Sequence, residues 1–161
     1  MNEAPQVTLI PEGDRGTVRL EDRFDTNIAD VWSAITDPDR AARWIAVVSG
    51  DFRVGGELTA SFTSDWQGTL RVEVCDAPHR LQLLAGAGDE QTVMEAVLSE
   101  DGAGTRLVVE ERGLPISDLP YHGAGWHVHL QDLAAMLAGE TPSPWEPRWR
   151  ELLPAYGVVS E

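Results

Sequence analysis

The chain has 161 residues, and its 27 acidic side chains outnumber the 12 basic ones, which gives a formal net charge of −15. A field of this sign repels phosphate backbones and anionic lipid headgroups, so the composition argues against nucleic acid as a partner. The opening MNEAPQVTLIPEGDRG lacks basic and apolar segments, and runs such as WIAVV are too short to cross a bilayer, so we expect no export signal, no membrane insertion and a cytoplasmic protein.

An apolar fraction of 42% and six Trp residues predict one packed domain. We expect a flexible N-terminal segment over residues 1–15, the domain over 16–139 and a Pro- and Trp-containing extension packed on it over 140–161. The single cysteine, Cys75, excludes an internal disulfide, and its strand-like surroundings predict a buried or half-buried thiol. This usage of cysteine fits a reducing compartment.

The first predicted strand is GTVRLEDRFD, residues 16–25, in which Val18, Leu20 and Phe24 alternate with charged residues. Asp22 falls on the same parity as these apolar residues, which predicts an inward-facing carboxylate. The segment IADVWSAITDPDRAARWI, residues 28–45, then predicts two short helices hinged at TDPD, with Thr26 or Asp30 available as a cap near the start.

A succession of strands follows these helices. The Gly-Gly pair in SGDFRVGGEL, residues 49–58, predicts a tight turn that opens a hairpin. Further strands are expected over 57–66, 68–75, 80–86, 91–100 and 105–114, separated by turn-rich spacers. Connections this short predict an antiparallel sheet, because parallel pairing needs long crossovers.

One long helix is expected from about residue 124 to residue 138, with Gly139 as a stop signal. At helical spacing Trp126, Leu130, Leu133 and Leu137 lie on one stripe, which must face the sheet. The segment 147–156 predicts one or two further turns of helix. The indoles of residues 145 and 149 are expected to dock on the body of the domain.

The histidines beside this stripe are candidates for ligands, catalysts or packing residues. His127 and His129 are two residues apart and point away from each other, whereas helical metal ligands sit three or four apart. His129 flanks the stripe, so it either lines a cavity or is a packed histidine satisfied by Asp132, and the second interpretation is the commoner one. We expect His127 to face solvent, and His79 and His122 to fall in loops.

Four segments in order resemble the family named for the activator of Hsp90 ATPase, within the START-like superfamily. They are RFDTNIADVWSAITDPDRAARW, GDFRVGGEL, GTRLVVEERGL and GWHVHLQDLAAML. The resemblance covers residues 16–139 and implies an α+β helix-grip fold. In this fold a curved antiparallel sheet wraps around a long C-terminal helix, two short helices follow the first strand, and an apolar cavity remains inside.

The family motifs carry over mostly onto positions that we interpret as structural, namely Asp51, Phe52, Gly55, Gly56, Gly125, Trp126, Leu130 and Leu133. One departure stands at the end of RLQLLAGAG, where relatives often have an aromatic residue and this chain has only small ones. A wider mouth or a flexible lid would follow from it.

No nucleophile elbow, metal-binding motif, phosphate loop or dinucleotide fingerprint occurs, so we expect no metal and no cofactor. Polar residues with inward parity are Asp22, Ser64, Glu95 and above all Glu111. A carboxylate in an apolar cavity is expected to have a raised pKa, unless strand twist redirects it to solvent. The full set of candidate cavity residues is Asp22, Phe62, Trp66, Met94, Glu111, Trp126, His129 and Met136.

The favoured hypothesis is a module that binds a small hydrophobic or aromatic molecule in the grip cavity. The first alternative is an enzyme of cyclase, dehydratase or hydrolase type that uses Glu111, His129 or Asp22 as acid and base. The second is a protein-interaction role such as activation of a chaperone ATPase, which the family name suggests. A homodimer through a sheet edge or the Trp-containing tail is compatible with each of these.

Overall fold

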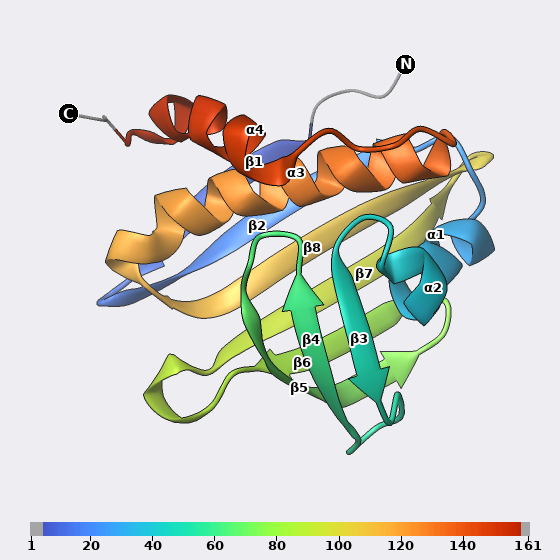
Figure 1. Cartoon of the computed structure of the whole chain (residues 1–161), viewed down its shortest axis with the longest axis horizontal. Helices are drawn as coiled ribbons and strands as arrows, with labels where there is room; N and C mark the ends of the chain where they lie inside the picture. Colours follow the sequence, from blue (N-terminus) through green and yellow to red (C-terminus); the bar gives the residue numbers. More distant parts are fainter. Residues whose placement is uncertain (1–4, 159–161) are drawn as a thin grey trace.

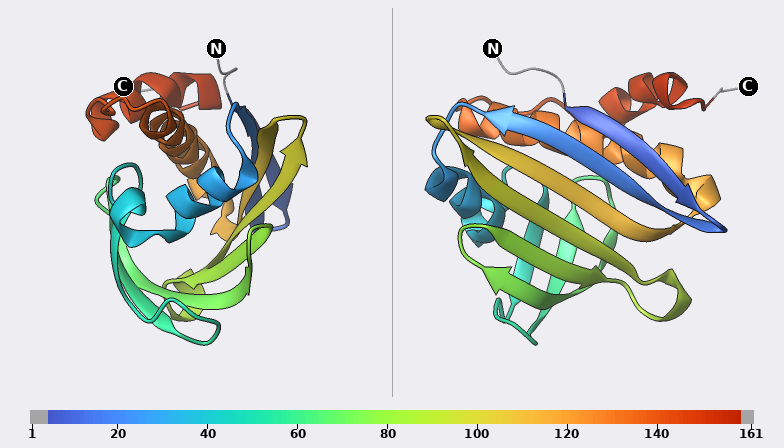
Figure 2. Two further views of the ribbon diagram at one scale, coloured as in Figure 1. Left: turned by 90° about the vertical axis from the view of Figure 1, so that its right-hand side faces the viewer. Right: turned by 180° about the vertical axis from the view of Figure 1, so that it is seen from behind.

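The computed structural model describes residues 5–158 and contains one eight-stranded antiparallel sheet that curves around a long helix (Figures 1 and 2). The strand order is β1-β2-β8-β7-β6-β5-β4-β3. The strands are β1 Gln6–Glu12, β2 Arg15–Phe24, β3 Ala46–Gly50, β4 Glu57–Phe62, β5 Gln67–Asp76, β6 Arg80–Ala85, β7 Thr92–Asp101 and β8 Gly104–Pro115.

The helices are α1 Ile28–Thr36, α2 Pro38–Ala41, α3 Leu119–Leu137 and α4 Trp145–Leu152, with short 3-10 turns η1 Gly88–Glu90, η2 Ile116–Asp118 and η3 Leu153–Tyr156. The sheet wraps around α3, and α1 and α2 close one end of the grip (Figure 2, left). The predicted helix-grip architecture is therefore confirmed. The cap of α1 is Asn27, whose side chain accepts a hydrogen bond from the backbone of Asp30 at 2.9 Å, and not Thr26 or Asp30.

The N-terminal segment departs from the expectation of a flexible tail over residues 1–15. Residues 6–12 form β1, which pairs with β2 from Gln6↔Glu21 to Glu12↔Arg15, while residues 1–4 lie outside the described range. Pro11 and several polar residues make this segment look unlike a strand in the sequence. An edge strand tolerates such residues, because the backbone groups on its outer side need no partner in a neighbouring strand. As a result the two short helices follow the second strand of the fold.

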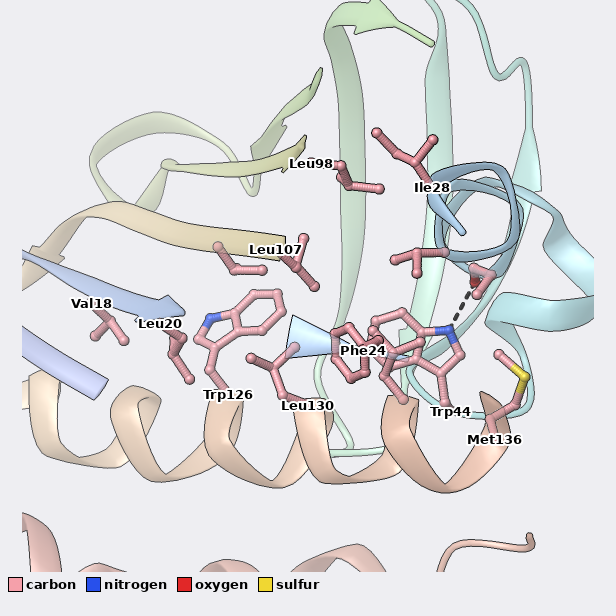
Figure 3. Packing of buried hydrophobic residues seen from close by; sticks show 14 of the residues in the cluster. Val18, Leu20, Phe24, Ile28, Trp44, Leu98, Leu107, Trp126, Leu130 and Met136 are labelled. Carbon is pink, nitrogen blue, oxygen red and sulfur yellow. Dashed lines mark hydrogen bonds between the residues drawn. The ribbon is translucent and has the colours of Figure 1, made fainter. Parts of the chain in front are cut away.

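The apolar stripe of α3 faces the sheet as predicted, with Leu130 and Leu133 fully buried. Trp126 and Leu130 project from α3 toward Leu20 of β2 and Leu107 of β8 (Figure 3). Burial of each such side chain contributes roughly 1.5–3 kcal/mol to the free energy of folding. This packing fixes the height of α3 above the sheet and hence the position of the polar residues on the same helix.

The C-terminal extension packs on the outer side of α3 through α4, where the Trp145 and Trp149 rings stack with centroids 5.7 Å apart. Arg148 of α4 pairs with the buried carboxylate of Asp132 on α3.

Cys75 is exposed at the end of β5, so the expectation of a buried or half-buried thiol is wrong. No helix among residues 5–158 combines the length and the apolar character that crossing a bilayer needs.

Candidate functional site

A cavity of about 760 Å³, called here the outer cavity, lies between the turn after β4, the loop after β6, the first half of α3 and α4. Its walls are rich in aromatic side chains: Phe62, Trp66, Tyr121, Trp126, Trp145 and Trp149. Two small residues, Ala85 and Gly86, line it at the end of β6, where the sequence suggested a wider mouth. A volume of this size is typical of small-molecule sites.

A smaller apolar space of about 100 Å³, called here the inner chamber, lies deeper in the grip. It is lined by side chains of the sheet and of the segment that contains α1 and α2, including Ile35, Trp44, Leu58, Leu70, Leu83 and Val109. Phe62, Met94 and Trp126 line both spaces. These three side chains therefore separate the outer cavity from a second space, whose lining is apolar except for Glu95.

The polar centre of the outer cavity is Glu111, which is 2% exposed on the inner face of β8. One carboxylate oxygen accepts hydrogen bonds from His122 Nδ1 at 2.8 Å and from Trp126 Nε1 at 3.0 Å. The other oxygen accepts one from the Thr92 hydroxyl at 2.8 Å. His122 and Trp126 are four residues apart on α3, so one face of the helix presents both donors to β8.

These contacts set the charge of Glu111 and His122. Burial raises the pKa of Glu111, but the hydrogen bonds from His122, Trp126 and Thr92 and the charge of His122 more than offset it, so the pKa lies below its ordinary value. Burial lowers the pKa of His122, yet the bond to Glu111 and the charges of Glu111 and Asp118 raise it above its ordinary value. The two side chains form an ion pair, and the expectation of a carboxylate with a raised pKa is wrong.

His129 is 5% exposed and lines the outer cavity, but the expected hydrogen bond to Asp132 is absent because Arg148 holds that carboxylate. Its Nδ1 atom is buried with no hydrogen-bond partner among the described residues, and the same is true of Trp145 Nε1. Burial lowers the pKa of His129 to about 3, so the ring is neutral near pH 7. His129 is thus a packing residue of the wall and not an acid or base at neutral pH.

A band of aromatic rings connects the two sides of the outer cavity, and His129 is its centre. Its ring centroid lies 5.9 Å from that of Phe62, 5.4 Å from that of Trp126 and 5.4 Å from that of Trp145. Phe62 in turn meets Trp66 edge to face at 5.3 Å. The band gives the cavity a wall of π faces and ring edges, on which flat ligand rings pack well.

The remaining candidates divide by position. Trp66 stands at the rim with 37% exposure, and Ser64 also lines the outer cavity. Asp22 is buried in β2, where its carboxylate accepts the backbone N–H of Arg23 at 2.8 Å, and it lines neither space. Met136 packs at the other end of α3 and also lines neither space. Glu95 forms ion pairs with Arg80 and Arg112, on the opposite face of β7 from Met94.

Sequence reasoning missed His122, because α3 begins at Leu119 and not near residue 124. Pro120 at the first turn is a helix-start signal that would have placed His122 on the helix, four residues before Trp126. His127 is also misplaced by the prediction, since its Nδ1 lies 2.9 Å from the Tyr156 hydroxyl under the C-terminal extension. His79 does fall in a turn, between β5 and β6.

Within residues 5–158 no group of three or more His, Cys, Asp or Glu side chains could hold a metal ion. The Glu111–His122 pair offers hydrogen bonding and proton exchange beside a large aromatic surface.

Comparison with known proteins gives a family and a set of related folds. The model of the family described as Activator of Hsp90 ATPase homolog 1-like protein matches residues 25–138. The chain is similar to the crystal structure of CalU16 from Micromonospora echinospora, at 27% identity and a TM-score of 0.79, over 96% of this chain and 97% of that chain. A search of the curated proteins found no match.

Two further structures share the fold. DynU16, described as a putative protein in the dynemicin biosynthetic locus, is 26% identical with a TM-score of 0.74, over 84% of this chain and 51% of that chain. The solution structure of the protein encoded by gene BPP1335 from Bordetella parapertussis is 24% identical with a TM-score of 0.73, over 100% of this chain and 97% of that chain. The chain thus spans about half the length of DynU16.

Proposed function

Since the chain belongs to the Activator of Hsp90 ATPase homolog 1-like family and has its helix-grip fold, we propose that it binds a planar aromatic small molecule in the outer cavity. The observation that carries the proposal is the aromatic wall around a space of about 760 Å³, which shares Phe62, Met94 and Trp126 with the lining of the apolar inner chamber. Concave, mostly apolar spaces with a few convergent polar groups are the usual form of small-molecule sites.

The description of DynU16 as a putative protein in a biosynthetic locus supports a small-molecule ligand, without pointing to its chemical class. The aromatic band supports a flat ligand over a flexible chain. Rings that lie against Trp and Phe gain about 0.5–1.5 kcal/mol per pair beyond the area they bury.

The proposal is tested by thermal unfolding against a panel of aromatic polyketide-like compounds, flavonoids and lipids. A ligand at about 100 times its Kd adds roughly 2.7 kcal/mol to the native state, which raises the Tm of a domain of this size by several degrees. The Trp66→Ala variant should lose most of the shift, because its indole stands at the rim of the cavity. The matched control is Val54→Ala, which removes an exposed side chain outside the cavity.

A selective shift that Trp66→Ala abolishes and Val54→Ala leaves intact supports the proposal. If no compound shifts the Tm, or if the two variants lose the shift equally, the proposal fails. In that case a pull-down with purified Hsp90 tests the interaction role that the family description suggests.

One observation favours a second candidate, acid–base catalysis in the same cavity. The carboxylate of Glu111 holds the imidazole of His122, which is the arrangement by which enzymes orient an acid or base. This candidate predicts that a bound compound is converted. Mass spectrometry of the compound after prolonged incubation with the protein distinguishes catalysis from binding alone, because a binding module leaves the compound unchanged.

A further inference from the structure

His122 offers a polar atom to the outer cavity, which its side chain lines with 40% exposure. Because an ionised carboxylate can only accept hydrogen bonds, Nδ1 donates to Glu111 Oε1 at 2.8 Å. The second ring nitrogen, Nε2, lies on the opposite side of the imidazole, and no hydrogen bond from a residue in the range 5–158 engages it. The orientation of the ring is thereby set, with Nε2 left for a ligand.

The ion pair with Glu111 determines whether Nε2 of His122 carries a hydrogen and can donate a hydrogen bond. The bond and the charge of Glu111, with a further contribution from Asp118, hold the pKa of His122 above its ordinary value against the effect of burial. The imidazole is then protonated over a wider pH range, and Nε2–H is a donor with a positive charge behind it. Charge-assisted donors form stronger hydrogen bonds than neutral ones.

The rim of the cavity carries charge of the opposite sign. Besides Glu111, which His122 neutralises, the lining holds five carboxylates and one guanidinium: Asp65, Asp89, Glu90, Asp118, Glu146 and Arg15. Because the Glu111–His122 pair is neutral as a whole, the rim sets the net charge of the cavity, which repels an anionic ligand and attracts a cationic one. The arrangement therefore discriminates against anions.

We propose that the outer cavity prefers aromatic compounds with a neutral carbonyl-type oxygen over aromatic carboxylates, and that the imidazolium of His122 donates a hydrogen bond from Nε2 to that oxygen. This inference rests on the proposed binding function and names its ligand class. Glu111 acts through His122 as a positioning residue, and Trp126 holds Glu111 from the same helix face through its Nε1 donor at 3.0 Å.

The experiment compares four naphthalene probes of nearly equal shape, substituted at the same ring position, with the unmodified protein in equilibrium dialysis. They are naphthyl methyl ketone, isopropenylnaphthalene, naphthoate and naphthylmethylammonium. The ketone and the isopropenyl compound differ only in an oxygen against a methylene group, so they isolate the hydrogen bond. We expect the ketone to bind about tenfold or more tightly than the isopropenyl compound. Naphthoate should bind more weakly than both the ketone and the ammonium compound, because the acidic rim repels it.

A variant locates the effect. His122→Phe should bring the affinity for the ketone down to that for the isopropenyl compound and leave the latter unchanged. Because that variant also leaves Glu111 without a hydrogen-bond donor at this position, His122→Gln provides a second test that keeps a neutral donor, and it should restore part of the preference. In the unmodified protein, ¹⁵N spectra of the histidines should show a shift of His122 Nε2 with the ketone and none with the isopropenyl compound.

Each outcome decides between the two proposals. Equal binding of the ketone and the isopropenyl compound overturns the role of His122 while the aromatic binding function stands. Binding of naphthoate that is tighter than that of the ketone or of the ammonium compound overturns the selection against anions. If none of the four probes binds, the proposed function itself fails, and this inference falls with it.

Discussion

Glu111 and His122 are eleven residues apart in the sequence, and their side chains meet at 2.8 Å across the junction between β8 and α3. The 3-10 turn η2 reverses the chain between them, so a sheet residue and a helix residue share one cavity wall. Trp126 and Thr92 complete the hydrogen bonds of the carboxylate. Both oxygens of this buried carboxylate accept hydrogen bonds, so the loss of any one donor should have a measurable effect on the site.

The first prediction concerns the charge of His122. In Glu111→Gln the largest influences that raise the pKa of His122 are gone, whereas burial, which lowers it, remains. The pKa of His122 should therefore fall below its value in the unmodified protein, as followed by NMR titration of its ring protons. Asp118→Asn, which removes a smaller contribution, should lower it less. An unchanged pKa in Glu111→Gln would show that the pair does not exist in solution.

The second prediction is a pH window for the stability that the pair provides. The folded pKa of His122 is raised from 6.5, so its contribution is complete below about pH 6.5 and is lost as the pH rises through the raised value. The folded pKa of Glu111 is lowered from 4.5, so its contribution is complete above about pH 4.5 and is lost as the pH falls through the lowered value.

The free energy of unfolding of the unmodified protein should thus exceed that of the double variant Glu111→Gln/His122→Gln most between about pH 4.5 and 6.5. Urea unfolding of both proteins across the pH range measures this difference. A difference that keeps growing from pH 6.5 into the alkaline range would have the wrong sign for this pair.

The third prediction concerns the docking of α4. Asp132 is 3% exposed, and burial raises its pKa while Arg148 opposes that rise. Arg148→Met leaves the carboxylate buried without its cation, and the loss should be about 3 kcal/mol of unfolding free energy. Acrylamide should also quench Trp145 more strongly. The control is Arg150→Met, which removes an exposed pair with Glu146 and should cost under about 0.5 kcal/mol. Equal effects of the two variants would contradict a specific role for Arg148.

The fourth prediction compares two aromatic substitutions in the same wall. His129→Phe keeps a ring among its neighbours and removes a buried nitrogen that lacks a partner, so it should raise the free energy of unfolding by about 1 kcal/mol. Trp126→Phe removes a donor to Glu111 and should lower it by at least about 1 kcal/mol. Urea unfolding measures both. Destabilisation by His129→Phe would contradict the prediction that the nitrogen without a partner costs the folded state free energy.

Local pattern predicted the parts of the fold in which one periodicity decides the structure. The alternation around Val18 and Leu20 gave β2, and the stripe from Trp126 to Leu133 gave the inner face of α3. The short connections between strands predicted only that the sheet is antiparallel. Its curvature around the long helix was predicted from the family resemblance.

The start of α3 was not predicted, because glycines in the segment before Trp126 are typical of a loop. Tertiary packing overrides that preference. A Cβ atom at Gly123 would lie 2.9 Å from a methyl of Leu9 and 3.2 Å from the ring of Tyr156, so glycine lets β1 and η3 approach the helix closely. These contacts come from the N-terminal strand and the C-terminal extension, and no local pattern contains them. The same error kept His122 out of the predicted site.

The most direct test of aromatic binding uses the methionine methyl signals in NMR spectra during titration with naphthyl methyl ketone. Met94 lines both the outer cavity and the inner chamber, whereas Met136 packs at the other end of α3 and lines neither. Ring currents of a bound naphthalene should shift the Met94 methyl signal in a saturable manner and leave that of Met136 in place. A Met94 signal that stays unmoved while the ketone saturates the protein would contradict binding in this cavity.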